Sequence, residues 1–226
     1  PNGVEDVACA FEGCTSLTTA PEIPDSVINM SNTFEDCTSL ITAPTISKKV
    51  TNMYRTFCNC SSLTTVPTIP NSVTNIDETF RGCTSLTVSP VMPNSITSMW
   101  GTFEDCTSLT TAPTIPNSVT DMSETFAHCT SLKIAPIIPS SVTDMSSTFS
   151  GCTSLTTVST IPNNVTDVWH TFNNCISLTG TIIINANPTD YYGCFASTVK
   201  PIVLTGSSSK LAELAFTAEN GNVTVK

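Results

Sequence analysis

The chain has 226 residues, of which 39% are hydrophobic and only 12% are charged, about half the usual charged fraction. Its net charge is −10 and it has no basic stripe, so nucleic acid and anionic lipid are poor candidate partners. No apolar run approaches the roughly 18 residues of a membrane span. No signal segment follows Pro1. We therefore expect a processed protein or a fragment, with any signal or anchor outside this chain.

A 23-residue repeat runs through most of the chain. The pattern Phe-x-x-Cys-x-x-Leu occurs eight times without an insertion, and two further apolar columns keep the same step. Stacked units of this kind bury an apolar face that one unit cannot bury alone, so the repeat predicts a solenoid. The cysteines of the repeat are Cys14, Cys37, Cys60, Cys83, Cys106, Cys129, Cys152 and Cys175.

Within one unit, residues 119–129 carry apolar side chains at spacings of three, four and three, which predicts a short helix. Asp121 and Glu124 fit a capping box at its start. Asp121, Asp144 and Asp167 also form a carboxylate column that could bind calcium. Capping is favoured because other copies place an uncharged residue there: Asn29, Asn52, Asn75 or Ser98.

A strand of three or four residues is predicted at 109–112. Pro113 and Pro116 follow it, and proline cannot donate to a sheet ladder, so we expect an extended arc and then a turn into the next helix. Threonine pairs recur on this strand, for example at 18–19 and 110–111. An ice-binding lattice is conceivable, but strand propensity explains the threonines better.

The pattern VTxMxxTFxxCTSLTxxPxIPxS resembles the bacterial leucine-rich repeats of BspA-like, or Treponema-type, surface proteins over residues 1–180. The resemblance implies an α/β solenoid, a right-handed superhelix with short parallel strands on one side and short helices on the other. It also implies secretion or cell-surface display in a bacterium, with adhesion or host-factor binding as the usual role of the family and a host or matrix protein or a glycan as the partner. One departure is that the apolar residues Ala112 and Ile115 follow the leading leucine by three and six positions, where the general consensus has three and five.

Two parts of the chain are distinguished. Residues 1–180 hold eight leucine-rich repeats, and residues 181–226 are predicted to be degenerate capping repeats that continue the solenoid. In the second part, 181–184, 201–204 and 222–225 are predicted strands, while 190–195 and 208–216 are predicted helices. At the other end, residues 1–4 align with 116–119, so the chain opens within a repeat and we expect further repeats or another domain before it.

The cysteine column could be metal-ligating, redox-active or structural. Zinc sites use paired spacings, and stacked parallel side chains rarely reach disulfide geometry. We therefore predict free thiols that fill small apolar gaps beside phenylalanine and leucine. Cys9, Cys58 and Cys194 fall outside the column, and their redox state stays open. Cys58 is predicted to be exposed, because Glu35 and Arg81 hold the same slot in other copies.

The sequence offers no catalytic constellation. His128 and His170 are the only histidines and lie at variable positions, and no nucleophile, base and orienting group recur together. We expect a non-enzymatic protein without a metal or cofactor. Tyr54, Trp100 and Trp169 share one column and could anchor a protein or glycan, although contacts between neighbouring repeats would also explain them.

Two functions are compatible with these observations. The first is a cell-surface or secreted binding module. The second is a structural spacer, a stalk or a phage-associated fibre segment without its own ligand, because the repeats differ so little. The sequence does not indicate an oligomeric state.

Overall fold

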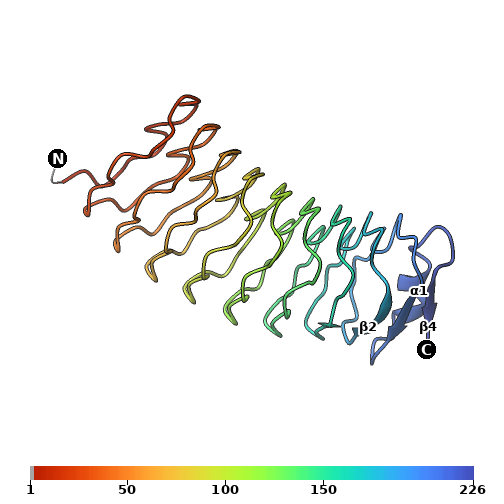
Figure 1. Cartoon of the computed structure of the whole chain (residues 1–226). Helices are drawn as coiled ribbons and strands as arrows, with labels where there is room; N and C mark the ends of the chain where they lie inside the picture. The colour runs from red at the N-terminus through yellow and green to blue at the C-terminus, as the bar shows by residue number, and fades with distance from the viewer. Residues whose placement is uncertain (1–2) are drawn as a thin grey trace.

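The computed structural model describes residues 3–226; Pro1 and Asn2, where the chain was expected to open within a repeat, lie outside them. The chain winds into a row of stacked coils, with its two termini at opposite ends of the row (Figure 1). Parallel bridges join residues 23 apart, for example Asn29 to Asn52 and Asn52 to Asn75. One repeat therefore makes one coil, and the predicted solenoid with parallel pairing is confirmed.

A single file of phenylalanine rings runs through the core. Neighbouring rings are stacked with centroids 5.4–5.8 Å apart and interplanar angles of 1–17°. Columns of buried leucine, cysteine, valine and methionine surround the file. Burial of each large side chain contributes about 1.5–3 kcal/mol. The file consists of Phe11, Phe34, Phe57, Phe80, Phe103, Phe126, Phe149, Phe172 and Phe195.

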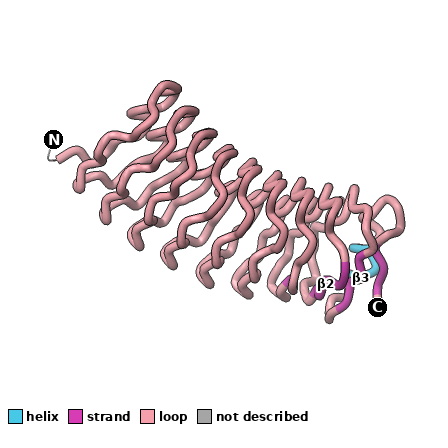
Figure 2. The backbone as a smooth tube through the Cα atoms, viewed as in Figure 1, coloured by secondary structure: helices cyan, strands magenta, loops and turns pink. Residues whose placement is uncertain are grey.

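The helices predicted on one side of the solenoid are not formed. Residues 123–128 make successive turns, and the only helix among the described residues is α1, Leu211–Ala215. Figure 2 shows loops along almost the whole row. The backbone gives the reason. Glu124 has φ 54° and His128 has φ 60°, whereas every residue of a right-handed α-helix has negative φ. We call residues 7–14 and their equivalents every 23 residues, up to 191–198, the turn band.

Backbone amides in the turn band alternate between two kinds of partner. From Met122 to His128, the even-numbered residues donate to carbonyls of the next coil at 2.6–3.0 Å. The odd-numbered residues from Thr125 to Cys129 donate to the carbonyl three positions earlier at 3.1–3.2 Å. Apolar side chains at spacings of three and four still point into the core, which is why the sequence pattern resembles that of a helix.

Regular strands form only at the C-terminal end of the described chain. β1 (Thr160–Ile161), β2 (Gly180–Ile184), β3 (Ile202–Thr205) and β4 (Val223–Val225) make a parallel sheet in that order, with α1 between β3 and β4 in the chain. β2, β3 and β4 coincide with the predicted strands. α1 is shorter than the helix predicted at 208–216, and the helix predicted at 190–195 is a bridge followed by turns. Within the described residues, no helix is long and apolar enough to cross a membrane.

In the repeats, the predicted strand at 109–112 is reduced to a single bridging residue, Thr111, which pairs with Val88. The extended segments that follow, residues 43–46, 66–69, 89–92, 112–115 and 135–138, are called the proline arcs. Among the described residues, no backbone hydrogen bond joins one of the first four arcs to its neighbour. Proline has no N–H to donate, and open grooves of about 1060 Å³ and 590 Å³ lie along the arcs.

Candidate functional site

Each coil enters the turn band through a side-chain cap. In the column of Asp121, nine side chains from Asp6 to Asp190 accept the backbone N–H two residues further on, at 2.8–3.3 Å. The predicted cap is therefore present, but it closes a turn of the Asx type rather than a helix. The capping-box role predicted for Glu124 is wrong, because the described residues show no hydrogen bond from its side chain to position 121.

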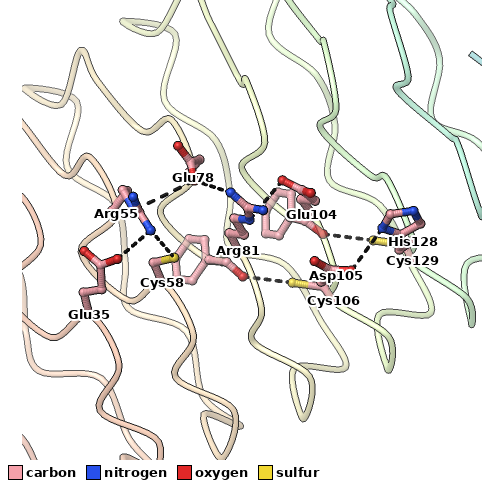
Figure 3. A network of polar contacts seen from close by, with 12 residues as sticks. Glu35, Arg55, Cys58, Glu78, Arg81, Glu104, Asp105, Cys106, His128 and Cys129 are labelled. Carbon is pink, nitrogen blue, oxygen red and sulfur yellow. Dashed lines mark hydrogen bonds and ion pairs between the residues drawn. The ribbon is translucent and has the colours of Figure 1, made fainter. Parts of the chain in front are cut away.

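Several variable positions of the turn band form a row of ion pairs across neighbouring coils (Figure 3). Arg55 contacts Glu35 and Glu78, and Arg81 lies 2.9 Å from Glu78 and 3.0 Å from Glu104. The three carboxylates are buried, while the two arginines remain partly exposed. We call these five residues the ion-pair row. The residues that differ between repeats here serve to join the coils.

Burial and pairing in the ion-pair row shift the pKa values of Glu104 and Arg81. Burial raises the pKa of Glu104, and the positive charge of Arg81 only partly opposes this effect. The hydrogen bond to Glu78 raises the pKa of Arg81, so the guanidinium keeps its charge. Removing a guanidinium would therefore leave a buried carboxylate without its partner, which destabilises far more than an exposed pair stabilises.

Seven of the eight cysteines in the column have the predicted structural role, and the eighth, Cys14, is exposed instead. All eleven cysteines are free thiols, and Cys37 to Cys175 of the column are buried. Each of these seven donates to the carbonyl of the phenylalanine 26 residues earlier, with S···O distances of 3.0–3.2 Å. Burial raises their pKa values, to about 11 for Cys37 and about 12 for Cys152, so the nucleophilic thiolate is scarce at neutral pH.

The prediction that Cys58 is exposed is wrong. Its side chain is fully buried, and the Arg55 guanidinium lies 3.6 Å from its sulfur atom. Burial raises the pKa of the Cys58 thiol although Arg55 acts in the opposite direction. The same slot is also buried in other coils, where it holds Glu35, Glu104 or Ala127, so burial belongs to the position in the coil. The exposed thiols are Cys9 and Cys14 in the first coil.

The threonine pairs of the short strand are exposed. The hydroxyl groups of Thr64, Thr110 and Thr156 donate to carbonyls of the preceding coil at 3.0–3.3 Å. These hydroxyls already have partners within the solenoid, which favours the strand interpretation over a free hydroxyl lattice.

The two histidines lie on the turn band in different surroundings. His128 is exposed, with its Nδ1 atom 3.1 Å from the Asp105 carboxylate, and Glu104 lies nearby. This group continues the pairing between coils that the ion-pair row begins. His170 instead lies between two aromatic rings, with centroid distances of 4.2 Å to Trp169 and 5.5 Å to Tyr192.

The structure does not bring the three predicted aromatic anchors together. Tyr54 and Trp100 are half-buried and two coils apart, with Asp77 between them, and the Tyr54 hydroxyl group donates to Glu78 at 3.3 Å. Trp169 lies three coils further along and is exposed. Tyr192 follows Trp169 by one repeat and is therefore a fourth aromatic residue of the same column. The predicted anchors did not include it, although the step of 23 residues leads to it.

Trp169, His170 and Tyr192 form a group of neighbouring rings near the C-terminal end of the row. A cleft of about 710 Å³ lies beside them. The last coils of the turn band supply His170, Asn173 and Tyr192 to its lining, and the segment containing α1 supplies Glu213 and Phe216. We call it the C-terminal cleft. The sequence does not indicate this cleft, because its second wall depends on where α1 lies against the last coils.

The chain resembles known proteins in both sequence and fold. A family model described as a BspA-type leucine-rich repeat region matches residues 7–101 and 123–221 in six copies. No curated protein matches the chain. Three solved structures are similar to it. One is a leucine-rich repeat protein from Bacteroides ovatus, with 19% identity, a TM-score of 0.55, and coverage of 95% of this chain and 69% of that one.

The second is the T. pallidum leucine-rich repeat protein, with 25% identity, a TM-score of 0.52, and coverage of 61% and 66%. The third is a leucine-rich cell-surface protein from Faecalibacterium prausnitzii, with 22% identity, a TM-score of 0.56, and coverage of 89% and 62%. The chain thus spans 62–69% of the length of these three proteins. Because the family model covers most of the chain, this protein belongs to the BspA-type leucine-rich repeat family.

Proposed function

We propose that this chain is a non-enzymatic binding module, displayed on a bacterial cell surface or secreted, whose ligand is a protein or a glycan. The observation that carries the proposal is the aromatic group of Trp169, His170 and Tyr192 beside the C-terminal cleft. Aromatic rings with one exposed face are common anchors of binding sites. Family membership supports the surface location, as does the similar F. prausnitzii structure, which is described as a cell-surface protein.

The chemistry of the turn band supports a role without catalysis. The thiols of the cysteine column are buried and donate to carbonyls. The capping aspartates accept backbone amides, and the glutamates of the ion-pair row face arginines. These groups are committed to holding coils together, and a catalytic site needs a nucleophile, a base and an orienting group that converge on open space.

A structural spacer is the second candidate, and the ion-pair row favours it. Glu35, Arg55, Glu78, Arg81 and Glu104 occupy variable positions, yet they contact each other rather than solvent-facing space. In the N-terminal half, variation between repeats is therefore explained by contacts between coils. Tyr54 takes part in the same contacts through Glu78, which leaves Trp100 and Trp169 as the more informative residues.

The experiment that separates the two functions is a binding screen with the purified chain against extracellular-matrix proteins and glycans. Trp100→Ala and Trp169→Ala variants are measured with it, and thermal unfolding confirms that each variant is folded. A binding module should bind at least one partner and lose affinity in one of these variants. Binding unchanged in both variants would exclude these tryptophans as anchors, and binding to nothing would favour the spacer.

A further inference from the structure

Two exposed aromatic residues in the C-terminal cleft have no structural role that the repeat explains. Tyr192 is 72% exposed and Phe216 is 88% exposed, and both line the cleft. The position of Tyr192 is held by small residues such as Ser123 and Ser146 in some coils and by Tyr54, Trp100 or Trp169 in others, so the stacking of coils does not require an aromatic ring there. In the α1 segment, Leu211 and Leu214 already supply the buried contacts. The two rings are thus available for a ligand.

The polar groups around these rings are mostly hydrogen-bond acceptors. The lining holds the carboxylates of Asp190, Glu213 and Glu219 and the side chain of Asn173, and it holds no lysine or arginine. Lys210 is close by, but its ammonium group lies 3.2 Å from Glu213 and over the Tyr191 ring. An anionic ligand would be repelled by the carboxylates, whereas hydroxyl groups would find acceptors there.

The imidazole of His170 is held in a fixed orientation at the wall of the cleft. Gly193 provides the space, because a Cβ atom there would lie 2.6 Å from the His170 ring. The Asn173 amide contacts Nδ1 of His170. The imidazole therefore adds one oriented polar group to a wall that otherwise offers mainly acceptors.

We propose that the C-terminal cleft binds a neutral glycan, with its sugar rings stacked on Tyr192 and Phe216 and its hydroxyl groups bonded to Asp190, Glu213 and Asn173. Aromatic faces carry negative charge density that attracts the C–H groups of a sugar ring. An extended or helical peptide would instead need an open sheet edge or an aliphatic groove, and Ala196 is the only aliphatic side chain in the lining. This inference rests on the binding-module function proposed above and names its ligand class.

The test is a glycan array that contains neutral and acidic glycans, followed by titration calorimetry with the best ligand, on the full chain. We expect neutral glycans to bind. Tyr192→Ala and Phe216→Ala should each raise Kd roughly tenfold or more, and both variants should keep the thermal midpoint because the rings are exposed. Val91→Ala, an equally exposed apolar side chain on a proline arc, is the matched control and should bind normally.

Three outcomes would overturn the inference. Binding of acidic glycans only would contradict the charge argument. Neutral glycan binding that both aromatic variants retain would place the site elsewhere on the chain. Binding to a matrix protein without any glycan binding would support the proposed binding function and refute a glycan as the ligand. Failure to bind either class would instead refute the proposed function itself.

Discussion

The turn band and the proline arcs are two sides of the same coil, and they join neighbouring coils in different ways. In the turn band, four amides between Met122 and His128 donate to the next coil. In the proline arcs from 43–46 to 112–115, the described backbone shows no such bond between coils. Proline lacks an N–H and fixes φ. The difference teaches that backbone hydrogen bonds join the coils in the turn band, whereas along the proline arcs the coils stack without them.

The C-terminal coils show what happens when proline is absent from the same position. Ser159 takes the place that Pro113 and Pro136 hold in earlier coils, and β1 begins directly after it. The Ile183 N–H then donates to the Ser159 carbonyl at 3.4 Å, and the Asn185 N–H donates to the Ile161 carbonyl at 3.0 Å. The apolar pattern of the arcs is compatible with a strand, and regular pairing is observed where this position lacks proline, so we expect proline to disfavour pairing between the arcs.

The largest expected effect comes from the core behind the turn band. Phe126→Ala should lower the free energy of unfolding by about 3–5 kcal/mol, because it removes one ring from a fully buried stack and leaves a cavity. Ile137→Ala on a proline arc, where the side chain is 81% exposed, should change it by less than about 0.5 kcal/mol. Urea unfolding followed by circular dichroism measures both, and similar losses in the two variants would contradict the comparison.

The second effect tests the ion-pair row. Arg81→Gln should lower the free energy of unfolding at pH 7 by about 1–3 kcal/mol, because Glu78 and Glu104 stay buried and lose a cationic partner. Burial already raises the pKa of Glu104 above its ordinary 4.5. The folded state therefore holds that proton more tightly than the unfolded state, and stability falls as pH rises from 4.5 toward the raised value.

Loss of Arg81 raises the pKa of Glu104 further, since the guanidinium acts to lower it. The difference between wild type and Arg81→Gln should therefore be larger at pH 7 than at pH 4, as measured by urea unfolding at both values. Lys133→Gln, which removes an exposed cation, is the control and should show a small difference at either pH. A pH-independent loss in Arg81→Gln would mean that Glu104 does not depend on this arginine.

A smaller effect is expected from the caps at the entrance to the turn band. Asp144→Ala should destabilise by about 0.5–2 kcal/mol, because the Ser146 N–H loses the acceptor that lies at 2.8 Å. Asp144→Asn should retain most of the stability, since Asn52 caps its own coil in the same way. Thermal unfolding compares the two, and equal losses would show that charge rather than the hydrogen bond stabilises the turn.

The sequence predicted the solenoid, the packing role of the cysteines and the cap, because each depends on a step of 23 residues that stacking enforces. The helix prediction failed because spacings of three and four fit both a helix and the alternating turns. A signal for the turns was present. The second left-handed position in each coil is held mainly by residue types that tolerate positive φ, namely Gly13, Asp36, Asn59, Gly82, Asp105, His128, Gly151, Asn174 and Ser197.

The candidate site was harder to predict than the fold. Trp169 was found from its column, and Tyr192 could have been found in the same way. Phe216 lies outside the repeat, and its approach to His170 depends on how the α1 segment lies against the last coils. The burial of Cys58 also needed the structure, because the charged residues Glu35 and Glu104 hold the same slot in other coils and are nevertheless buried. Contacts outside the repeat register leave no periodic trace in the sequence.

The smallest expected change in stability tests the role of proline directly. Pro136→Thr places an N–H where Ser159 has one, in the coil next to β1. The unfolded chain gains freedom worth about 0.4–1 kcal/mol, while a new hydrogen bond contributes about 0.5–1.5 kcal/mol, so the two effects nearly cancel. Hydrogen exchange should nevertheless become slower over residues 135–138 and at β1, because the sheet extends by one coil.

Pro21→Thr is the matched control, since it removes the equivalent proline in the first coil, whose neighbour keeps Pro44 and has no strand. Removal of this proline also gives the unfolded chain more freedom, but the neighbouring coil has no strand with which the new N–H could pair. This variant should therefore be less stable and show no added protection from hydrogen exchange. If Pro136→Thr behaves like Pro21→Thr, proline is not what keeps the arcs apart, and the loss of pairing must come from the course of the coil itself.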